Sequence, residues 1–300
     1  MKVGIVGLGD IAKKGYLPVL SQRENTELVL CTRNIETLHM LKGKYRIKEG
    51  YDNLDSLIGS GIEAAFISTT TDAHFETAQK LLTAGINLYI DKPISMNFEE
   101  TSIIKELSEK SGKIVMVGFN RRFSPMIRAL KDKGRADLII IQKNRYKLPD
   151  NVRRFVVEDF IHVVDTLRFL MGTEVLDVKV SFSKKDNLLH NLVLQLKGEG
   201  NTSIGIMNRN SGVTEETIEY MTPENKYVVN NFAETTCYTD KTKTVTGFGD
   251  WDNTLYKRGF YQIIDHFIYC IENNKTPDPS FEDSYKTHKL CEKIVQIIGE

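Results

Sequence analysis

The sequence has no surplus of either charge and no long apolar run. Lysine plus arginine and aspartate plus glutamate each number 40, so the formal net charge is +0. This balance lacks the basic footprint typical of proteins that bind nucleic acid or an anionic membrane surface. No apolar stretch approaches the roughly 20 residues that cross a bilayer, and the first residues, MKVGIVG, read as a strand rather than a signal peptide. We therefore expect a cytoplasmic protein that acts on a small molecule and binds neither nucleic acid nor membrane.

Cysteine is scarce as well. The chain has 4 cysteines, which stand far apart at Cys31, Cys237, Cys270 and Cys291. No two of them form a C-x-x-C pair, and no histidine–cysteine cluster has the spacing of a zinc site. This pattern predicts free thiols in a reducing compartment and no metal centre.

What the first 120 residues do contain is an alternation of apolar strands and helices. The expected strands are Lys2–Val6, Thr26–Thr32, Glu63–Ser68, Ile86–Ile90 and Ile114–Phe119. Because these strands are apolar throughout and helices separate them, the pattern predicts a parallel sheet covered on both faces.

Beyond residue 120 the pattern changes to alternating strands joined by polar turns. Strands are expected at Asp137–Tyr146, Val175–Ser183, Leu189–Leu196, Thr202–Arg209, Thr217–Met221, Lys226–Val229 and Thr235–Thr239, with helices at Val152–Met171, Gly259–Glu272 and Glu282–Ile298. Alternation of this kind predicts an antiparallel or mixed sheet with one solvated face. The chain is therefore α/β, with one domain over residues 1–120 and a second, α+β domain over residues 121–300, whose last helix can pack back on the first.

A glycine-rich turn follows the first strand. Gly7 and Gly9 begin the pattern G-x-G-x-x-A, which ends at Ala12, and Asp10 and Ile11 open the helix. The first glycine permits a tight turn, the second lets a pyrophosphate approach the backbone, and the small alanine lets helix and strand pack closely. A strand, this turn and a helix together predict a dinucleotide site.

The end of the second strand indicates which dinucleotide binds. An NAD site usually has an acid there for the ribose 2′-hydroxyl, whereas this strand ends in Thr32 and Arg33. A hydroxyl and a guanidinium suit a 2′-phosphate, so NADP(H) is favoured over NAD(H). The alternative is that Arg33 is a solvated residue at a helix start.

Ligands of such sheets lie outside the carboxyl ends of the strands. Residues expected there as cofactor contacts are Thr69, Thr70, His74 and Asn120. His74 has an alternative role at a helix start, and Asn120 has one in linking the domains.

Lys92 follows the fifth strand in the sequence DKP. With a pKa lowered by partial burial and by a cationic nicotinamide, a lysine at this edge can exchange a proton with a hydroxyl or carbonyl group. The alternative is a structural ammonium that ties two strand ends together.

The helix expected over residues 152–171 carries a polar stripe. Glu158, His162 and Asp165 stand at i, i+4 and i+7 beside an apolar face. His162 can orient a substrate or donate a proton, with an acid fixing its tautomer. The alternative is a half-buried histidine with satisfied hydrogen bonds.

Together these motifs resemble the Gfo/Idh/MocA oxidoreductases, most closely the MviM-type members. The supporting runs are GLGDIAKKGYLPVL, DKP, MVGFNRRFSP, EDFIHVVDTLRFL and KRGFYQIIDHFIYCIENN. The resemblance implies an N-terminal Rossmann domain and a C-terminal domain with a large, mostly antiparallel open sheet, whose face often forms a homodimer contact. It also implies hydride transfer between a nicotinamide and a sugar, cyclitol or polyol.

The resemblance assigns roles to particular residues. The lysine of the family box falls on Lys92, the helical histidine on His162 and the family acid on Glu158, with Asp159 beside it. The glycine usual two residues before the histidine is Phe160 here. Further substrate candidates are Arg121, Asp159, Trp251 and Arg258. The alternative is that Trp251 is a packed core residue and Arg258 a surface residue.

Two functions follow. The first is an enzyme that uses Lys92 and His162. The second is a cofactor-binding sensor or regulator on the same fold without turnover, which Phe160 favours.

Overall fold

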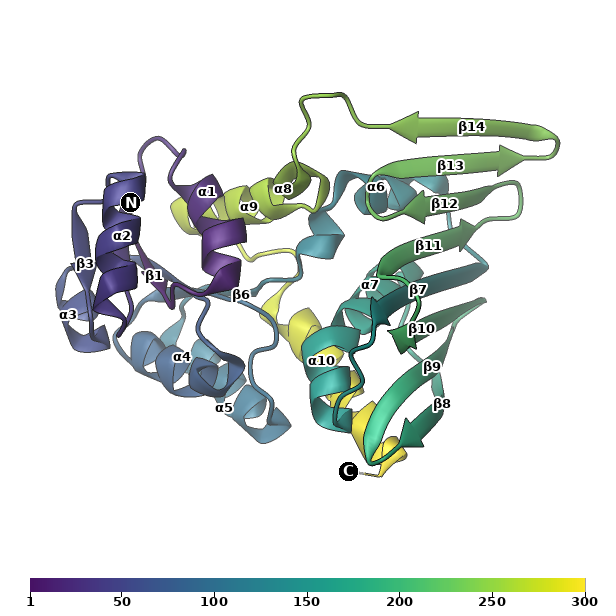
Figure 1. The fold of residues 1–300 in the computed structure, drawn as a ribbon, viewed down its shortest axis with the longest axis horizontal. Helices are drawn as coiled ribbons and strands as arrows, with labels where there is room; N and C mark the ends of the chain where they lie inside the picture. Colours follow the sequence, from purple (N-terminus) through teal and green to yellow (C-terminus); the bar gives the residue numbers. More distant parts are fainter. Residues whose placement is uncertain (300) are drawn as a thin grey trace. The chain divides into compact units, whose positions relative to one another are not determined.

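The computed structural model describes residues 1–299, which form two compact units. The first unit contains residues 1–118 and 260–286, and the second contains residues 119–259 and 287–299 (Figure 1). The sequence placed one break near residue 120. The structure divides the chain after Gly118 and returns residues 260–286 to the first unit.

The first unit is built on a six-stranded sheet in the order β3-β2-β1-β4-β5-β6, in which every neighbouring pair is parallel. Its strands are β1 (Lys2–Val6), β2 (Glu27–Cys31), β3 (Glu49–Tyr51), β4 (Ala64–Ile67), β5 (Asn87–Ile90) and β6 (Val115–Val117). This is the order of a doubly wound dinucleotide-binding sheet, and it confirms the predicted fold class.

Helices connect these strands. They are α1 (Leu17–Leu20), α2 (Ile35–Tyr45), α3 (Leu54–Gly59), α4 (His74–Thr83) and α5 (Phe98–Ser111), with short turns η1 (Ala12–Tyr16) and η2 (Thr71–Ala73). Asparagine side chains accept a backbone N–H at the start of three of them, namely Asn34 for α2, Asn53 for α3 and Asn97 for α5. The segment η1, expected as ordinary helix, is π-helical.

Helix α9 (Phe260–Glu272) joins the first unit through aromatic packing. Phe267 meets the rings of Phe66 and Tyr89 edge-on at 5.4 and 5.6 Å, and Phe260 lies 5.9 Å from Tyr16. Such pairs add to the free energy gained by burying the rings. The cluster explains why a segment so late in the sequence belongs to the N-terminal sheet.

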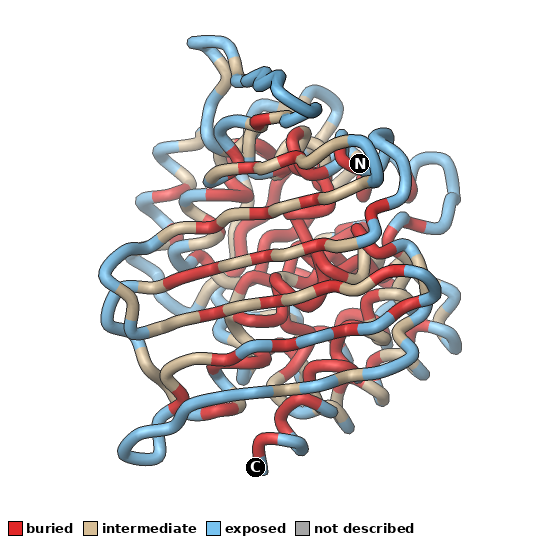
Figure 2. Tube along the Cα trace, turned by 90° about the vertical axis from the view of Figure 1, so that its right-hand side faces the viewer, coloured by how far each residue is buried: buried red, intermediate tan, exposed pale blue. Residues whose placement is uncertain are grey.

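The second unit contains an eight-stranded sheet in the order β14-β13-β12-β11-β7-β10-β9-β8. Its strands are β7 (Leu138–Tyr146), β8 (Asp177–Lys185), β9 (Leu188–Gly198), β10 (Asn201–Ser211), β11 (Glu215–Met221), β12 (Lys226–Asn230), β13 (Glu234–Thr239) and β14 (Thr242–Gly247). Only β7 and β10 pair in parallel, so the sheet is mostly antiparallel as expected. Buried and less buried residues alternate along its central strands (Figure 2).

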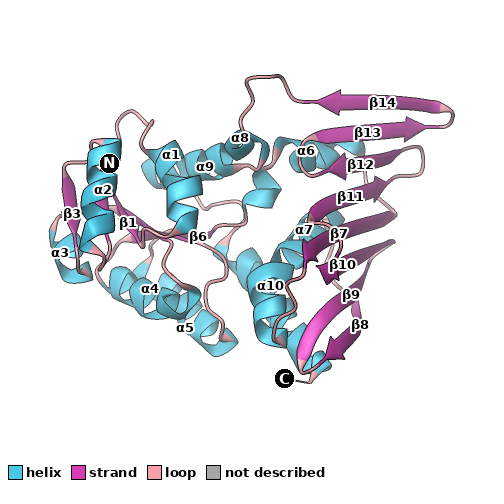
Figure 3. Cartoon of the chain, in the orientation of Figure 1, coloured by secondary structure: helices cyan, strands magenta, loops and turns pink. Residues whose placement is uncertain are grey.

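One face of this sheet carries α7 (Ile161–Met171), which contacts β7 and β10 (Figure 3). The preceding segment η5 (Arg154–Phe160) is bonded to β7 through Asp159 and Lys143. The remaining elements are η3 (Asn120–Phe123), α6 (Pro125–Arg128), η4 (Ala129–Lys133), α8 (Thr254–Lys257) and α10 (Phe281–Ile298), which begins in the first unit and ends in the second. Among the described residues, no helix combines the length and the apolar character needed to cross a bilayer.

Candidate active site

The glycine turn has the backbone geometry that the sequence predicts. Gly7 has φ +86°, and a Cβ atom built on it would lie 2.5 Å from the Thr69 backbone nitrogen, so only glycine fits there. A Cβ atom on Gly9 would meet nothing within 4 Å, because open space lies beyond it. Ala12 is fully buried beneath the turn.

This turn borders a cavity of about 830 Å³ at the carboxyl ends of β1, β2, β3 and β4. Of the predicted cofactor contacts, the cavity is lined by Gly7, Gly9, Asp10, Ile11, Thr32, Arg33, Thr69 and Thr70. The Thr69 hydroxyl oxygen is buried and has no hydrogen-bond partner among residues 1–299. A buried orphan oxygen next to an open glycine turn fits a bound polar ligand such as a dinucleotide.

We expect Gly9→Ala to weaken cofactor binding about tenfold without loss of stability. The added methyl group enters the open space at the turn and meets no protein atom within 4 Å. Gly43→Ala is the matched control, because a Cβ atom there also meets nothing and the site lies on helix α2 away from the cavity. Isothermal titration with NADPH and NADH measures the effect, and equal affinity of the two variants would remove Gly9 from the cofactor site.

The part of the cavity at the ends of β2 and β3 carries charges of both signs. Arg33 and Thr32 line it from the end of β2, and Asp52, at the end of β3, lines it as well. Asp52 was not predicted as a site residue, because the strand before it, Glu49–Tyr51, is only three residues long and has too few apolar residues to be recognised from the sequence.

Contacts on both sides hold the DKP segment in place. The Tyr16 hydroxyl donates a hydrogen bond to the Asp91 carboxylate, and burial, together with the Asp91 charge, raises the pKa of Tyr16 well above its usual range. On the other side, His74 places Nδ1 2.8 Å from the Pro93 carbonyl oxygen and Nε2 3.2 Å from that of Thr69. Lys92 therefore stands on a fixed turn at the same sheet edge as the glycine turn, and His74 ties that turn to the cavity wall.

In the second unit the acid/histidine helix departs from regular geometry. Residues 154–160 are π-helical, with about one residue more per turn than an α-helix. Glu158 pairs with Arg154 at 3.3 Å and is partly exposed, whereas Asp159 turns inward to Lys143 and Arg145. His162 is buried, and its carbonyl oxygen accepts a hydrogen bond from Thr166.

Asp165, the third residue of the stripe, has a structural environment. Its carboxylate accepts two hydrogen bonds from Arg122, at 2.6 and 2.8 Å, and one from Thr287 at 3.1 Å. Both charged side chains are almost fully buried. The i, i+4, i+7 stripe of the sequence is thus divided among three environments.

Phe160, which stands in the family's glycine position, is a core residue of the second unit. Its ring is fully buried against the sheet, where a Cβ atom on Gly205 of β10 would lie 3.3 Å from the ring and 2.8 Å from Val163. The missing side chain at Gly205 makes room for the ring, so Phe160 packs toward the sheet.

The remaining candidates also lie in the second unit. Asn120 donates a hydrogen bond to the Arg258 carbonyl oxygen at 2.8 Å, and Arg121 binds Glu216 through two hydrogen bonds of 2.7 and 2.8 Å. Arg258 stacks on the Phe232 ring at 5.1 Å. Trp251 is 98% exposed, so its ring contacts little of the protein.

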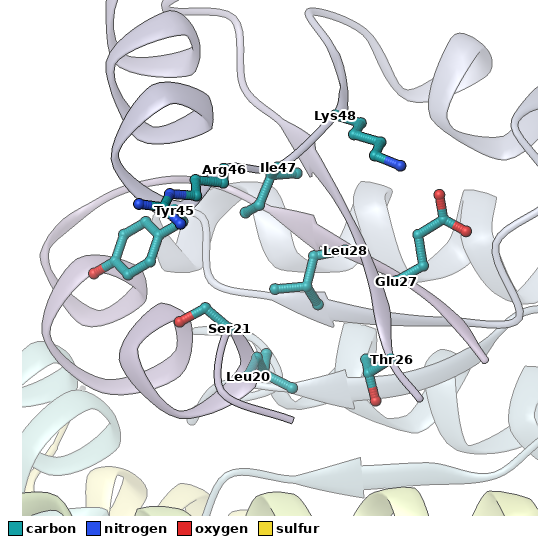
Figure 4. A pocket seen from close by; sticks show the side chains of 9 residues that line it. All are labelled: Leu20, Ser21, Thr26, Glu27, Leu28, Tyr45, Arg46, Ile47 and Lys48. Carbon is teal, nitrogen blue, oxygen red and sulfur yellow. The ribbon is translucent and has the colours of Figure 1, made fainter. Parts of the chain in front are cut away.

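A second cavity, of about 380 Å³, lies at the amino end of β2 (Figure 4). It is lined by Leu20, Ser21, Thr26, Glu27, Leu28, Tyr45, Arg46, Ile47 and Lys48. Because ligands of doubly wound sheets bind at the carboxyl ends of the strands, this cavity is on the wrong edge for the cofactor. Residues 1–299 contain no group of three or more histidine, cysteine or acidic side chains placed to hold a metal ion.

Comparisons with known proteins agree with this geometry. Residues 1–119 match the family model of the Gfo/Idh/MocA oxidoreductases, described as an oxidoreductase family with an NAD-binding Rossmann fold, and residues 125–240 match a YceM-like C-terminal domain. The crystal structure of a dehydrogenase (MviM) from Clostridium difficile is 32% identical, with a TM-score of 0.94 over 99% of both chains.

Two curated relatives are similar over most of their length. The putative oxidoreductase YceM of Salmonella typhimurium is 28% identical over 98% of this chain and 97% of its own. An inositol 2-dehydrogenase of Rhizobium meliloti is 24% identical over 100% of this chain and 97% of its own.

The fold and the glycine turn therefore define an oxidoreductase with an NAD-binding Rossmann domain. Within that class, the chain belongs to the Gfo/Idh/MocA family, as its sequence motifs predict.

Proposed function

We propose that the protein is an NADP(H)-linked dehydrogenase or reductase that acts on a CH–OH group of a sugar, polyol or related carbonyl compound. The observation that carries this proposal is the position of Lys92. It follows β5 in a parallel sheet whose β1 leads into the open glycine turn, so both stand at the same edge. The name of the inositol 2-dehydrogenase relative supports a polyhydroxylated substrate.

The residues that would hold the dinucleotide are those that line the larger cavity. The backbone at Gly7 and Gly9 would face the pyrophosphate, and Thr32 and Arg33 would face a 2′-phosphate. The presence of Asp52 in the same cavity is the observation that favours NAD(H) instead, because a carboxylate can hold a ribose 2′-hydroxyl.

When bound, the nicotinamide supplies hydride exchange with the substrate carbon. Lys92 would take the proton of the substrate hydroxyl during oxidation and return it to a carbonyl oxygen during reduction. His162 would orient the substrate, with Glu158 or Asp159 as the assisting acid. Asp159 is the better placed of the two acids to act inside the unit, because Glu158 faces outward toward Arg154.

We expect Arg33→Ser to weaken NADPH binding about 10- to 100-fold while NADH binding stays within about twofold, because one charge-assisted contact to the 2′-phosphate is lost. Arg46→Ser is the matched control, since Arg46 lines the cavity at the opposite edge (Figure 4). Equal loss for both cofactors, or none, would assign Arg33 to the solvated helix start. A thermal-shift screen of NADPH, NADH and their oxidised forms, followed by sugars and polyols, tests the proposal as a whole.

The sheet of the second unit supports a further proposal, that the protein forms a homodimer through its outer face. On that face, away from α7, the central strands carry Ile140, Val193, Ile204, Ile206 and Val228, none of them fully buried. An apolar stripe on an uncovered sheet face is typical of an interface.

A further inference from the structure

The inner face of the second unit's sheet carries a cluster of charged side chains between the strands and η5. Its members come from five separate elements and from loops, and no local sequence pattern links them. They are Arg121, Lys143, Arg145, Asp150, Asp159, Arg209, Glu216 and Arg258.

Lys143 lies at the centre of this cluster. Its ammonium donates hydrogen bonds to the Asp159 carboxylate and, at 3.1 Å, to the Asp159 carbonyl oxygen, and its side chain is 2% exposed. Glu216 stands directly opposite on β11. Burial and the nearby charge of Arg121 lower the pKa of Lys143 to about 7, in spite of these two acids. Burial is the larger of the two causes, and the charge of Arg121 adds to it.

The acids of the cluster are shared among too many cations. Asp159 accepts hydrogen bonds from Lys143 and Arg145, and the Arg209 Nε atom lies 3.9 Å from its carboxylate. That Nε atom is buried and has no hydrogen-bond partner among the described residues. The other bond of Arg209, to Asp150, is long at 3.4 Å. One guanidinium donor is therefore buried without a hydrogen bond.

Arg258 is a cation of the cluster that has no carboxylate within ion-pair distance among the described residues. Arg121 and Arg258 stack on the same Phe232 ring, at 5.5 and 5.1 Å, but only Arg121 has a carboxylate partner, which is Glu216. Arg258 forms no ion pair with any residue of the range 1–299, and its side chain is exposed. Partial desolvation and the charge of Arg121 lower its pKa.

Phe232 lies in the turn that joins β12 and β13, which the Ala233 backbone N–H closes by donating to the Asn230 carbonyl oxygen. Asn231 and Phe232 have φ of 47° and 62°, which is rare for a bulky residue. The Asn231 side chain accepts the Glu216 backbone N–H at 2.9 Å, so the turn is fixed to the cluster.

The charges of the cluster do not balance. The cations are Arg121, Lys143, Arg145, Arg209 and Arg258, and the acids are Asp150, Asp159 and Glu216, which leaves a surplus of two positive charges while Lys143 is protonated. Nearby Glu158 is already paired with Arg154, and Glu215, next to Glu216 on its strand, bonds to Asn144. A surplus of positive charge at a partly buried site favours the binding of an anion.

We propose that this cluster, with Arg258 and Arg145 as its solvent-accessible members, binds a negatively charged group of the substrate, a carboxylate or a phosphate. The proposal rests on the proposed function and narrows it, because the substrate class becomes an acidic sugar or polyol derivative. Lys143 and Arg121 are buried and add positive charge to the site. The Phe232 ring holds the guanidinium groups of Arg121 and Arg258 in place.

Small anions test the site directly. With the preferred cofactor at saturation, so that the glycine turn is filled, malonate or inorganic phosphate at ten times its Kd should raise the melting temperature by about 2–4 °C relative to chloride at equal ionic strength. A response to malonate alone identifies a carboxylate site, and a response to phosphate alone identifies a phosphate site. No stabilisation by either anion overturns the proposal.

The variant Arg258→Gln should abolish this stabilisation, whereas Lys257→Gln should retain it. Lys257 is the matched control because it removes the same charge one residue away, where the side chain stacks on Phe248 instead. Arg258 is exposed, so we expect the variant to fold, and its melting temperature without added anion checks this. Stabilisation that survives in Arg258→Gln excludes the cluster as the anion site.

The anion effect should also depend on pH. Lys143 faces Asp159, Glu216, Arg121 and Arg145, and its lowered pKa of about 7 predicts that it loses its proton as the pH rises from 6 to 8. The affinity for malonate, whose own charge changes less than that of phosphate over this range, should therefore be several-fold higher at pH 6. Calorimetry with malonate in two buffers of different ionisation enthalpy should show proton uptake on binding at pH 7.5. No proton uptake would argue against an anion beside Lys143.

Substrate comparisons separate this inference from the proposed function. Turnover should favour gluconate over sorbitol, or glucose 6-phosphate over glucose, by about tenfold or more in kcat/KM. Turnover of the neutral compounds at equal efficiency overturns the anion site but leaves the dehydrogenase standing. Anion binding that Arg258→Gln abolishes, without cofactor-linked oxidation of any compound, overturns the dehydrogenase and leaves the anion site.

Discussion

Lys92→Ala is expected to lower turnover by about 10²- to 10⁴-fold, the contribution typical of one general acid/base group. The cofactor should bind with an affinity within about threefold of wild type, because Lys92 does not line the cavity that the glycine turn borders. The DKP turn should stay in place, since Asp91 and Pro93 are held by Tyr16 and His74. The measurements are kcat under saturating substrate and cofactor affinity by titration.

Two further variants separate a catalytic Lys92 from a structural ammonium. Lys92→Arg keeps the positive charge, but a guanidinium does not release its proton at neutral pH, so a catalytic role predicts an inactive enzyme and a structural role predicts rescue. Added methylamine should restore part of the activity of Lys92→Ala but not of Lys110→Ala, an exposed control on α5 that starts near wild-type activity. Wild-type turnover in Lys92→Ala would remove the residue from the mechanism.

Asp165→Ala is expected to destabilise the second unit by about 3–5 kcal/mol. Arg122 and Asp165 have side-chain exposures of 5% and 1%, so the variant leaves a guanidinium buried without its anion, and Thr287 also loses its acceptor. Urea unfolding followed by circular dichroism measures the change in the free energy of unfolding.

The matched control is Glu219→Ala, in the same unit. It breaks an accessible ion pair between Glu219 of β11 and Lys226 of β12, and it should lower the free energy of unfolding by at most about 1 kcal/mol. The double variant Arg122→Met with Asp165→Leu should regain most of the lost stability, because replacing a buried pair by apolar residues is often nearly neutral. If Asp165→Ala proved no more costly than the control, the buried pair would carry no net stabilisation.

The fold was largely predictable because its signals are local. Apolar strands spaced by helices, and the pattern of Gly7, Gly9 and Ala12, depend on neighbouring residues alone, and all of them have counterparts in the structure. The strands β3 and β14 were missed since the first is three residues long and the second is exposed along its length. Neither has the apolar alternation that marks a half-buried strand.

The candidate site was less predictable because it depends on contacts between distant residues. A helical stripe assumes 3.6 residues per turn, and the π-helical segment 154–160 breaks that assumption, so Asp159 rather than Glu158 turns inward. The space for Phe160 is provided by Gly205, 45 positions later in the sequence. No window of sequence around Phe160 contains that information.

The aromatic packing of α9 has a consequence for any attempt to dissect this chain. A fragment that ended at residue 118 would lack Phe260 and Phe267. The rings of Tyr16, Phe66 and Tyr89, which pack against them, would then be exposed to solvent. Shuffling halves between relatives at a single junction would create the same defect. A functional chimaera therefore has to exchange residues 1–118 and 260–286 together, which requires three junctions in the chain.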